Sequence, residues 1–332
     1  MNLSPVMNSN KQALIRVEHL VKHFPVRLGA YREKKGIVHA VDDISLDVFQ
    51  GETLGLVGES GCGKSTTGYT ILQLYRPTSG KIYYQDTDLT VLSEKQLRPV
   101  RKKIQIIFQD PYSTLNPRMT IGNAIAEPIR VHKIMPEKEA IERVMELLTD
   151  VGLGPECLNR YPHEFSGGQR QRICTARSLA CQPEFVVCDE PISALDVSIQ
   201  AQIINLLQDL QAKYNLTYLF IAHDLSVVQH ISNRVAVMYL GMMAEMAPKE
   251  VLFNQPRHPY TIALLSAVPK PNPHTEKTRK RQVLGGDVPS SLNPPSGCRF
   301  HPRCPIAGDE CRVQIPVWRQ VGDGHWVACH KV

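Results

Sequence analysis

Residues 53–65 read Thr53-Leu-Gly-Leu-Val57-Gly58-Glu59-Ser60-Gly61-Cys62-Gly63-Lys64-Ser65. The uninterrupted run at 53–57 predicts a buried strand, and the pattern from Lys64 to Leu74 predicts a helix directly after the glycines. The residues between them follow the spacing G-x-x-x-x-G-K-[ST], in the strand, loop and helix context that this motif requires. Such a loop turns successive backbone N–H groups inward around a phosphate, at the positive end of the helix dipole. The stretch therefore predicts an α/β protein that binds a nucleotide.

Two side chains of this loop have specific roles toward a nucleotide. Lys64 supplies a positive charge to the terminal phosphates, and the Ser65 hydroxyl can reach a magnesium ion bound to them. By residue frequencies the match arises by chance in on the order of one chain in a hundred, so an ordinary glycine turn is the weaker interpretation. The residues expected to contact the nucleotide are Gly58, Glu59, Ser60, Gly61, Cys62, Gly63, Lys64, Ser65 and Thr66.

Two adjacent carboxylates, Asp189 and Glu190, follow the apolar run 185–188. They emerge at the carboxyl end of a strand, where open parallel sheets place their chemistry. Asp189 is the expected magnesium ligand, directly or through water. Glu190 lies on the alternate side of the strand, where it can orient and deprotonate a water that attacks the γ-phosphate. The presence of the second acid favours ATP hydrolysis over nucleotide binding alone. The alternative is that the two acids are an ordinary solvated pair on the surface.

Short apolar runs alternate with helical segments along the chain, and this alternation predicts a mostly parallel sheet with helices on both faces. The runs are residues 104–108, 185–188, 218–222 and 235–240. Ahead of the loop, Ile44, Leu46 and Val48 alternate with polar residues as a half-buried antiparallel strand does.

Two other regions depart from this alternation. Residues 121–131 and 140–151 show helical spacing with no buried strand among them, which predicts an inserted helical subdomain at about 110–180. Past about residue 253, frequent prolines break any long element. We expect a small irregular C-terminal domain there.

A second helix start suited to an anion lies at Ser166-Gly167-Gly168-Gln169. A hydroxyl and two glycine amides at a helix N-terminus suit a phosphate. Because the first loop already holds the nucleotide of this subunit, a partner molecule would supply the second phosphate. Taken alone, the stretch fits a plain serine cap followed by flexible glycines equally well.

The composition is that of a globular protein: 332 residues, 42% hydrophobic and 21% charged. No apolar run approaches the roughly 18 residues of a membrane-spanning helix, so we expect a cytosolic chain. The net charge of +6 includes no long run of like charges in the body of the chain, which argues against nucleic acid as a partner.

Taken together, the motifs over residues 14–253 resemble the nucleotide-binding subunit of ATP-binding cassette (ABC) transporters. The resemblance implies a P-loop NTPase fold of the ABC type, with a mixed sheet core, an antiparallel β subdomain and an inserted helical subdomain. It also implies ATP and Mg²⁺ as cofactors. Two such subunits face head to tail, and Ser166, Gly167, Gly168 and Gln169 of one close on the ATP of the other.

The same resemblance gives roles to residues outside these motifs. Gln109 is similar to the family glutamine that contacts magnesium and senses the membrane subunit. Asp196 lies in a stretch that resembles the loop crossing the dimer interface. His223 resembles the switch histidine that contacts the γ-phosphate and holds Glu190 and its water in place.

The adenine ring is expected to stack on an aromatic side chain near the start of the chain. Phe24, at the end of the opening strand, is the candidate. Tyr31 is its rival, because the loop at 25–36 is longer than in many family members.

Two stretches of the C-terminal region, residues 257–268 and 292–298, resemble the extension of oligopeptide and dipeptide importer ATPases. With them the resemblance spans nearly the whole chain, and the stretches VGESGCGKST and YPHEFSGGQRQR are most similar to the dipeptide importers. By its pattern alone, the segment 257–268 also fits a proline-started helix that packs Leu264, Leu265 and Val268.

Four of the nine cysteines crowd the C-terminal end, at Cys298, Cys304, Cys311 and Cys329. A reducing cytosol and the odd count favour metal ligation over disulfides. Their spacing, C-x5-C-x6-C-x17-C, is unlike the close pairs usual for structural zinc, and the family resemblance implies a [4Fe-4S] cluster on these four thiolates. Zinc and the absence of any metal remain alternatives. His301, His325 and His330 are further candidate ligands.

We therefore expect residues 12–253 to form the ABC ATPase domain and residues 254–332 a C-terminal peptide-importer extension. The expected function is ATP hydrolysis that powers peptide import at the cytoplasmic face of the inner membrane, with this chain as a peripheral subunit. The resemblance implies a sister ATPase subunit, two transmembrane permease subunits and an extracytoplasmic peptide-binding protein as partners, with no nucleic acid. A homodimer and other cargoes, such as a metal chelate or a haem precursor, remain alternatives.

Two other functions are weaker. A soluble cassette ATPase acting on DNA or ribosomes usually carries paired cassettes or a long coiled-coil insertion, and the sequence has neither. An iron–sulfur sensor would leave Glu190 and His223 without a purpose.

Overall fold

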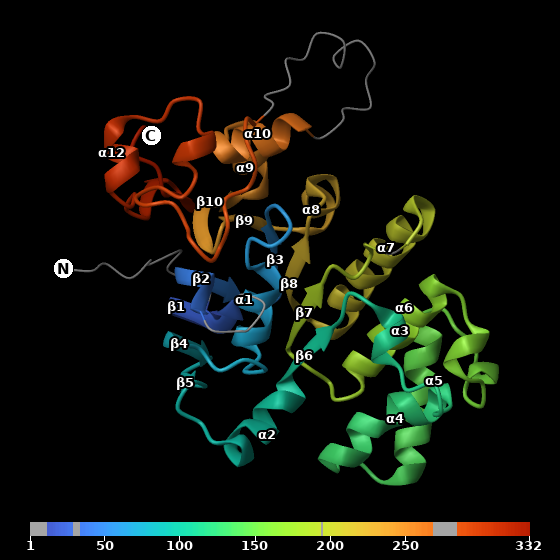
Figure 1. Ribbon diagram of the computed structural model, residues 1–332. Helices are drawn as coiled ribbons and strands as arrows, with labels where there is room; N and C mark the ends of the chain where they lie inside the picture. Colours follow the sequence, from blue (N-terminus) through green and yellow to red (C-terminus); the bar gives the residue numbers. More distant parts are fainter. Residues whose placement is uncertain (1–11, 29–33, 194, 268–283) are drawn as a thin grey trace, which may run out of the picture. The chain divides into compact units, whose positions relative to one another are not determined.

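The computed structural model describes residues 12–28, 34–193, 195–267 and 284–332. By its internal contacts the chain divides into two compact units (Figure 1). Unit 1 draws on residues up to 47, 54–90 and from 223 onward, and unit 2 on residues 48–53 and 91–222. Among the described residues, no helix combines the length and the apolar character that crossing a membrane requires.

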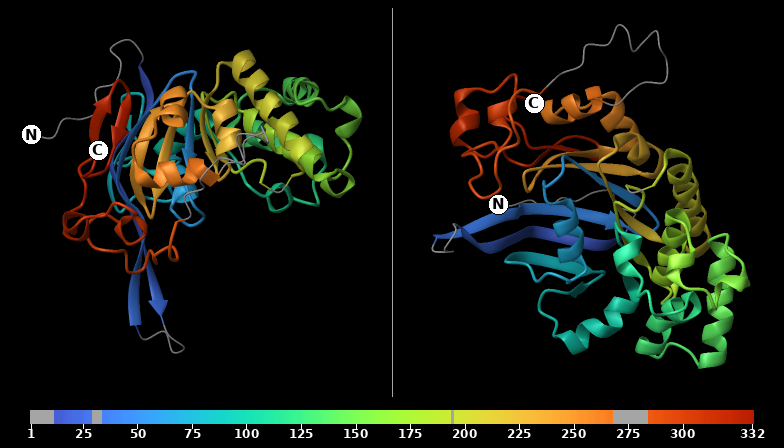
Figure 2. Two further views of the ribbon diagram at one scale, coloured as in Figure 1. Left: turned by 90° about the horizontal axis from the view of Figure 1, so that it is seen from above. Right: turned by 45° about the vertical axis from the view of Figure 1, so that its right-hand side comes forward.

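Unit 1 contains an antiparallel sheet that includes two long strands. The strand order is β2-β1-β4-β5, with β1 (Ala13–Leu28), β2 (Lys34–Phe49), β4 (Ser79–Tyr84) and β5 (Thr87–Asp88). Figure 2 shows β1 and β2 running side by side. Ile44 and Leu46 of β2 are fully buried, as their alternation with polar residues predicts.

The phosphate loop belongs to a second set of strands in unit 1. Strand β3 (Thr53–Val57) pairs in parallel with β9 (Arg234–Tyr239), which pairs antiparallel with β10 (Met242–Pro248). Every residue of β3 is buried, as expected for a strand covered on both faces. Helix α1 (Lys64–Ile71) follows the loop, and α8 (Leu225–Ile231) precedes β9. The mixed sheet expected from the sequence is therefore present in this unit.

The C-terminal region is more regular than its many prolines suggested. Strands β11 (Arg319–Gly322) and β12 (His325–Val327) form a hairpin around Gly324, and β12 pairs antiparallel with β10. The expectation of an irregular tail misses this hairpin because no proline lies in residues 319–327. The other elements of the region are α9 (Lys249–Asn254), α10 (Pro259–Ala267), η3 (His301–Arg303) and α12 (Asp309–Val313).

Unit 2 contains three parallel strands in the order β8-β7-β6. They are β6 (Ile104–Ile107), β7 (Phe185–Asp189) and β8 (Thr217–Ala222), and every residue of β7 and β8 is buried. Helix α2 (Glu94–Lys103) leads into β6, and α7 (Val197–Tyr214) connects β7 to β8.

The remaining helices of unit 2 lie between β6 and β7 in the chain. They are α3 (Pro111–Thr114), α4 (Ile121–His132), α5 (Glu137–Asp150), η1 (Pro155–Cys157), η2 (Pro162–Glu164) and α6 (Gly167–Leu179). Helix α4 packs against α5 and α6, and Figure 1 shows these helices together in green. The buried faces of α4 and α5 follow the helical apolar spacing of the sequence.

Candidate nucleotide site

The phosphate loop of unit 1 depends on two glycines for its shape. Gly58 has φ +154° and Gly63 has φ +104°, which are conformations that residues with a side chain rarely adopt. A Cβ at Gly58 would lie 2.2 Å from the carbonyl oxygen of Met238, and a Cβ at Gly63 would lie 2.1 Å from that of Ala40. The loop is therefore pressed against its neighbours, and its course requires glycine at both positions.

Lys64 begins α1 and is held inside the loop. Its Nζ donates to the carbonyl oxygens of Gly58, at 2.8 Å, and Glu59, at 3.1 Å. The residue is only 4% exposed. An ammonium group fixed in this way is an ordered donor for an anion at the helix start.

Cys62 occupies the buried side of the same loop. Burial raises the pKa of its thiol, and the nearby Lys64 opposes this effect only in part. The Cys62 carbonyl accepts a hydrogen bond from the backbone N–H of Gly241 at 2.9 Å. Cys62 therefore serves the packing of the loop as a neutral thiol.

In unit 2, the two predicted acids end strand β7. Asp189 is 1% exposed, and Glu190 follows it with φ +43°, an uncommon left-handed conformation for a residue with a side chain. The Nε2 of Gln109 donates to Glu190 Oε2 at 3.0 Å, and Ser193 Oγ donates to the Glu190 carbonyl at 3.1 Å. The structure thus brings Gln109 and Glu190 together, and it adds Ser193, which the sequence indicated only as the start of the stretch that contains Asp196.

The second helix start is also formed as the sequence predicts. Ser166 is the N-cap of α6, its Oγ accepts from the N–H of Gln169, and the Gln169 side chain accepts from the Ser166 N–H at 3.0 Å. This is a capping box, and Ser166 and Gln169 are both exposed. Gly168 packs so closely that a Cβ would come within 2.6 Å of Ile199 Cγ2. The helix start is accessible from outside the chain.

The structure describes three other predicted residues, each within its own unit. Phe24 is half-buried, with the Lys22 Nζ 4.7 Å above its ring and Tyr75 5.3 Å away in an edge contact. Asp196 is exposed at the N-cap of α7, and His223 is exposed directly after β8.

Tyr31, the alternative aromatic, lies outside the described residues. Adenine stacking on Phe24 therefore stays a prediction.

The four C-terminal cysteines lie in one segment of unit 1. The N–H of Cys298 donates to the Cys311 carbonyl at 2.8 Å. Burial, with a smaller contribution from the charges of Cys311, Cys304 and Cys329, raises the pKa of Cys298 to about 11. Burial likewise raises the pKa of Cys304 and of Cys329.

Among the described residues, the only group of three or more His, Cys, Asp or Glu ligand atoms within 4.8 Å of one another is His23, His39 and Asp42. The four cysteines therefore do not form such a compact group.

A contact that the sequence did not indicate joins the phosphate loop to the C-terminal region. Arg303 donates from Nη1 to Glu59 Oε2 at 2.7 Å and from Nη2 to Glu59 Oε1 at 3.0 Å. The Glu59 N–H donates to the Tyr260 hydroxyl at 2.9 Å. Tyr260 is fully buried, whereas Leu264 and Leu265, two of the expected packing residues of this helix, are only half-buried. The third, Val268, lies outside the described residues.

Two protein-family models match parts of this chain. Residues 41–193 match the model described as "ABC transporter", and residues 244–311 match "Oligopeptide/dipeptide transporter, C-terminal region". The two matches cover the phosphate loop, the acids of β7, the Ser166 helix start and three of the four C-terminal cysteines.

Curated relatives match over nearly their whole length. The chain is 53% identical over 323 residues to the oligopeptide transport ATP-binding protein AppF of Bacillus subtilis, covering 97% of this chain and 98% of that protein. It is 50% identical over 318 residues to the probable peptide ABC transporter ATP-binding protein y4tS of Sinorhizobium fredii, covering 96% and 90%.

Two solved structures match about three quarters of the chain or slightly less. The ATP-binding cassette MJ0796, in a dimeric post-hydrolysis state bound to ADP and phosphate, is 28% identical with a TM-score of 0.63. The match covers 71% of this chain and 98% of that one. The cbiO1 protein of Clostridium perfringens is 25% identical with a TM-score of 0.64, and the match covers 74% and 92% of the two chains.

Proposed function

This chain belongs to the ABC transporter family, and within it to the peptide-import ATP-binding proteins, and from that membership we propose how its residues use ATP. It is the ATP-hydrolysing subunit of a peptide importer, and membrane permease subunits are its partners. In this proposal residues 12–253 form the nucleotide-binding domain, with the helical subdomain at about 110–180, and residues 254–332 form the C-terminal extension.

The loop at 58–66 binds the phosphates of ATP, with Lys64 as the charged donor. The hydroxyl of Ser65, the carboxylate of Asp189 and the amide oxygen of Gln109 hold Mg²⁺, since oxygen ligands are those this ion prefers. When bound, Mg²⁺ would supply positive charge against the charge that develops on the phosphates. Glu190 accepts the proton of the attacking water, and the contact from Gln109 at 3.0 Å supports this role because it orients the carboxylate.

Three further residues complete the proposed assignment. His223 contacts the γ-phosphate and keeps Glu190 and the water in place. Asp196 lies at the interface of two ATPase subunits, and its exposure supports that position. Phe24 stacks on the adenine.

In this proposal two ATPase subunits share each ATP. One observation supports this sharing. Two helix N-termini with glycine amides matter here, one behind the phosphate loop and one at Ser166, and the second is exposed. Since a subunit binds its own ATP at the loop, the exposed Ser166-Gly167-Gly168-Gln169 start closes on the ATP of the partner. The dimeric state of the MJ0796 cassette supports this arrangement by analogy.

Replacement of Ser166 by arginine tests the shared site. The bulky cation blocks approach of the partner's phosphates, so ATP turnover of the assembled transporter falls by at least about tenfold. Binding of ATP to the isolated chain stays unchanged, because the phosphate loop is intact. Phosphate release by the complex and a nucleotide titration of the chain measure the two effects.

The matched control is Ser93→Arg. Ser93 caps α2 with the same kind of capping box, in which its N–H donates to the Gln96 side chain at 2.9 Å. Loss of either cap costs about 1 kcal/mol of stability, so the two variants share any purely structural effect. The shared site would be contradicted if Ser166→Arg and Ser93→Arg gave the same ATP turnover, whether both kept it or both lost it to the same extent.

A sister ATPase subunit forms the other half of the pair. Two transmembrane permease subunits form the path for the peptide, and an extracytoplasmic peptide-binding protein delivers it. The chain works as a peripheral subunit at the cytoplasmic face of the inner membrane. The names of the relatives, which describe peptide transport and import, support a peptide as the transported substrate.

The four C-terminal cysteines hold a [4Fe-4S] cluster in our proposal. Tetrahedral zinc, with Zn–S bonds of about 2.3 Å, needs its sulfur atoms about 3.8 Å apart, and the thiols do not form a group within 4.8 Å. Cys298 lies near the other three thiols, whose charges act to raise its pKa, and four thiolates are the donor set of such a cluster. The cluster, when bound, would cross-link a segment that contains little apolar material.

Purification of the chain without oxygen is expected to yield about four iron and four sulfide per chain. Cys304→Ser and Cys329→Ser should lose most of this iron. Cys174→Ser and Cys181→Ser are the controls, because these buried thiols belong to unit 2, and they should keep it. Zinc without iron, or no metal in the wild-type chain, would contradict the cluster.

A further inference from the structure

The C-terminal segment reaches the phosphate loop through an ion pair between Arg303 and Glu59. The guanidinium of Arg303 binds both carboxylate oxygens, at 2.7 and 3.0 Å. The Arg303 side chain is 7% exposed and that of Glu59 is 25% exposed. A two-pronged pair in this partly buried setting is stronger and less screened than a pair on the open surface.

Every polar group of the Glu59 backbone is also engaged. Its N–H donates to the Tyr260 hydroxyl at 2.9 Å, and its carbonyl oxygen accepts from Lys64 Nζ at 3.1 Å. Glu59 therefore connects the C-terminal segment to the lysine that is to bind the phosphates. A shift of Glu59 would move one of the two carbonyls on which that ammonium group rests.

Aromatic packing holds Arg303 and Tyr260 in place. The rings of Tyr239, Tyr260 and Phe300 contact one another, with centroids 4.7 to 5.3 Å apart. The Arg303 Nη1 also lies 3.4 Å from the Tyr239 hydroxyl. The ion pair thus lies against a cluster of packed aromatic rings.

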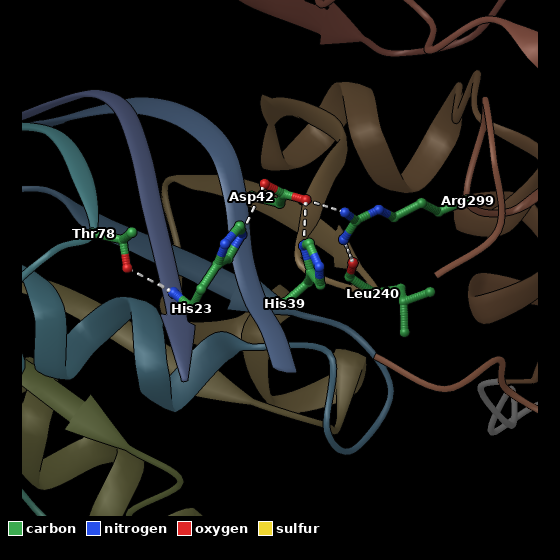
Figure 3. A network of polar contacts seen from close by, with 6 residues as sticks. All are labelled: His23, His39, Asp42, Thr78, Leu240 and Arg299. Atoms are coloured by element: carbon green, nitrogen blue, oxygen red, sulfur yellow. Dashed lines mark hydrogen bonds and ion pairs between the residues drawn. The ribbon is translucent and has the colours of Figure 1, made fainter. Parts of the chain in front are cut away.

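A second arginine of the same segment, Arg299, makes polar contacts with other parts of unit 1 (Figure 3). It donates to the carboxylate of Asp42 and to the carbonyl oxygen of Leu240. Burial acts to raise the pKa of Asp42, but Arg299 and His23 together hold it below its usual value. Because Arg299 already neutralises Asp42, the cluster of His23, His39 and Asp42 serves as an anchor, and we assign no cation to it.

The negative charge of Glu59 makes its ion pair with Arg303 important for nucleotide binding. Glu59 is the one acidic residue in the sequence 58–66, and the loop is to bind a polyanionic triphosphate. An uncompensated carboxylate there repels the phosphates, whereas the guanidinium of Arg303 cancels its charge.

We propose that Arg303 and Tyr260 are positioning residues of the nucleotide site, so that the ATP affinity of the phosphate loop depends on the C-terminal segment. Arg303 cancels the charge of Glu59, and Tyr260 fixes its backbone. The inference rests on the proposed binding of ATP by the loop at 58–66. It assigns to the C-terminal segment a direct part in ATP binding.

Nucleotide titrations of the full-length chain test this assignment. Arg303→Met is expected to weaken ATP binding roughly tenfold, and the weakening should shrink at high salt because the repulsion is electrostatic. Glu59→Gln in the Arg303→Met background should restore binding, since no charge then remains to be cancelled. Tyr260→Phe, which keeps the ring, should weaken binding about threefold.

Arg257→Met is the matched control, because it removes the same charge from an exposed site of unit 1 and should bind ATP as the wild type does. Thermal unfolding of each variant identifies those that do not fold. Arg303→Gln, which keeps a polar side chain beside Glu59 and Tyr239, keeps the test decisive in that case, since it should also weaken ATP binding roughly tenfold.

The inference is overturned if folded Arg303→Met binds ATP like the wild type. It is also overturned if the double variant binds as weakly as Arg303→Met, or if folded Arg303→Gln binds ATP like the wild type. Failure of the wild-type chain itself to bind ATP would instead overturn the proposed function.

Discussion

Glu190→Gln is expected to lower ATP turnover by about 10²- to 10⁴-fold while ATP binding persists. The amide cannot accept the proton of the attacking water, but its oxygen still accepts the hydrogen bond that Gln109 Nε2 donates at 3.0 Å. The side chain should therefore keep its place and lose only its basicity. Phosphate release by the assembled transporter measures turnover, and a nucleotide titration measures binding.

Glu184→Gln is the control for this variant. Glu184 lies directly before β7, at the strand end opposite Glu190, and pairs with Lys103 at 2.8 Å on the surface. It should turn over ATP at nearly the wild-type rate, since exposed pairs contribute little to stability. Substantial hydrolysis by the Glu190→Gln transporter would assign the base to another residue.

Lys64→Ala is expected to weaken ATP binding about 10- to 100-fold, the usual worth of a hydrogen bond to a charged group. The ammonium group is buried and fixed by the carbonyls of Gly58 and Glu59, so no neighbouring lysine can take its place. Titration of the full chain with ATP measures the change.

Lys64→Ala is also expected to lower the stability of the fold, and this effect must be measured separately from the loss of ATP affinity. Removal of Lys64 leaves two loop carbonyls without their donor, which costs about 1–3 kcal/mol. Thermal unfolding of the nucleotide-free chain measures that cost, and Lys81→Ala, at an exposed site of β4, is the control for the loss of charge. Wild-type ATP affinity in Lys64→Ala would refute the role of this lysine.

The sequence predicts much of the fold because its buried strands are continuous apolar runs. Strand β3 has the predicted bounds, and β6, β7, β8 and β9 each begin or end within one residue of them. Helix α1 ends at Ile71, before the expected Leu74, because Gln73 adopts the left-handed φ of +57°. A change of backbone conformation at a single polar residue leaves no trace in a hydrophobic pattern.

The sequence pattern did not predict helix α2 or the hairpin formed by β11 and β12. Helix α2 buries only Leu97, so its apolar pattern is too sparse to indicate a helix. Every residue of β11 is exposed, and β12 is three residues long. Asp323-Gly324 is a turn signal, but the strands on either side are too short to mark a hairpin.

By itself the sequence determines the local parts of the nucleotide site. The spacing of the glycines sets the course of the loop, and the cap at Ser166 sets the start of α6, since both depend on neighbours only a few residues apart. The tertiary structure alone decides that Arg303 and Tyr260 meet Glu59. These partners stand 244 and 201 positions away along the chain. Contacts of that separation arise when the chain closes long loops around a common core, and no local pattern encodes them.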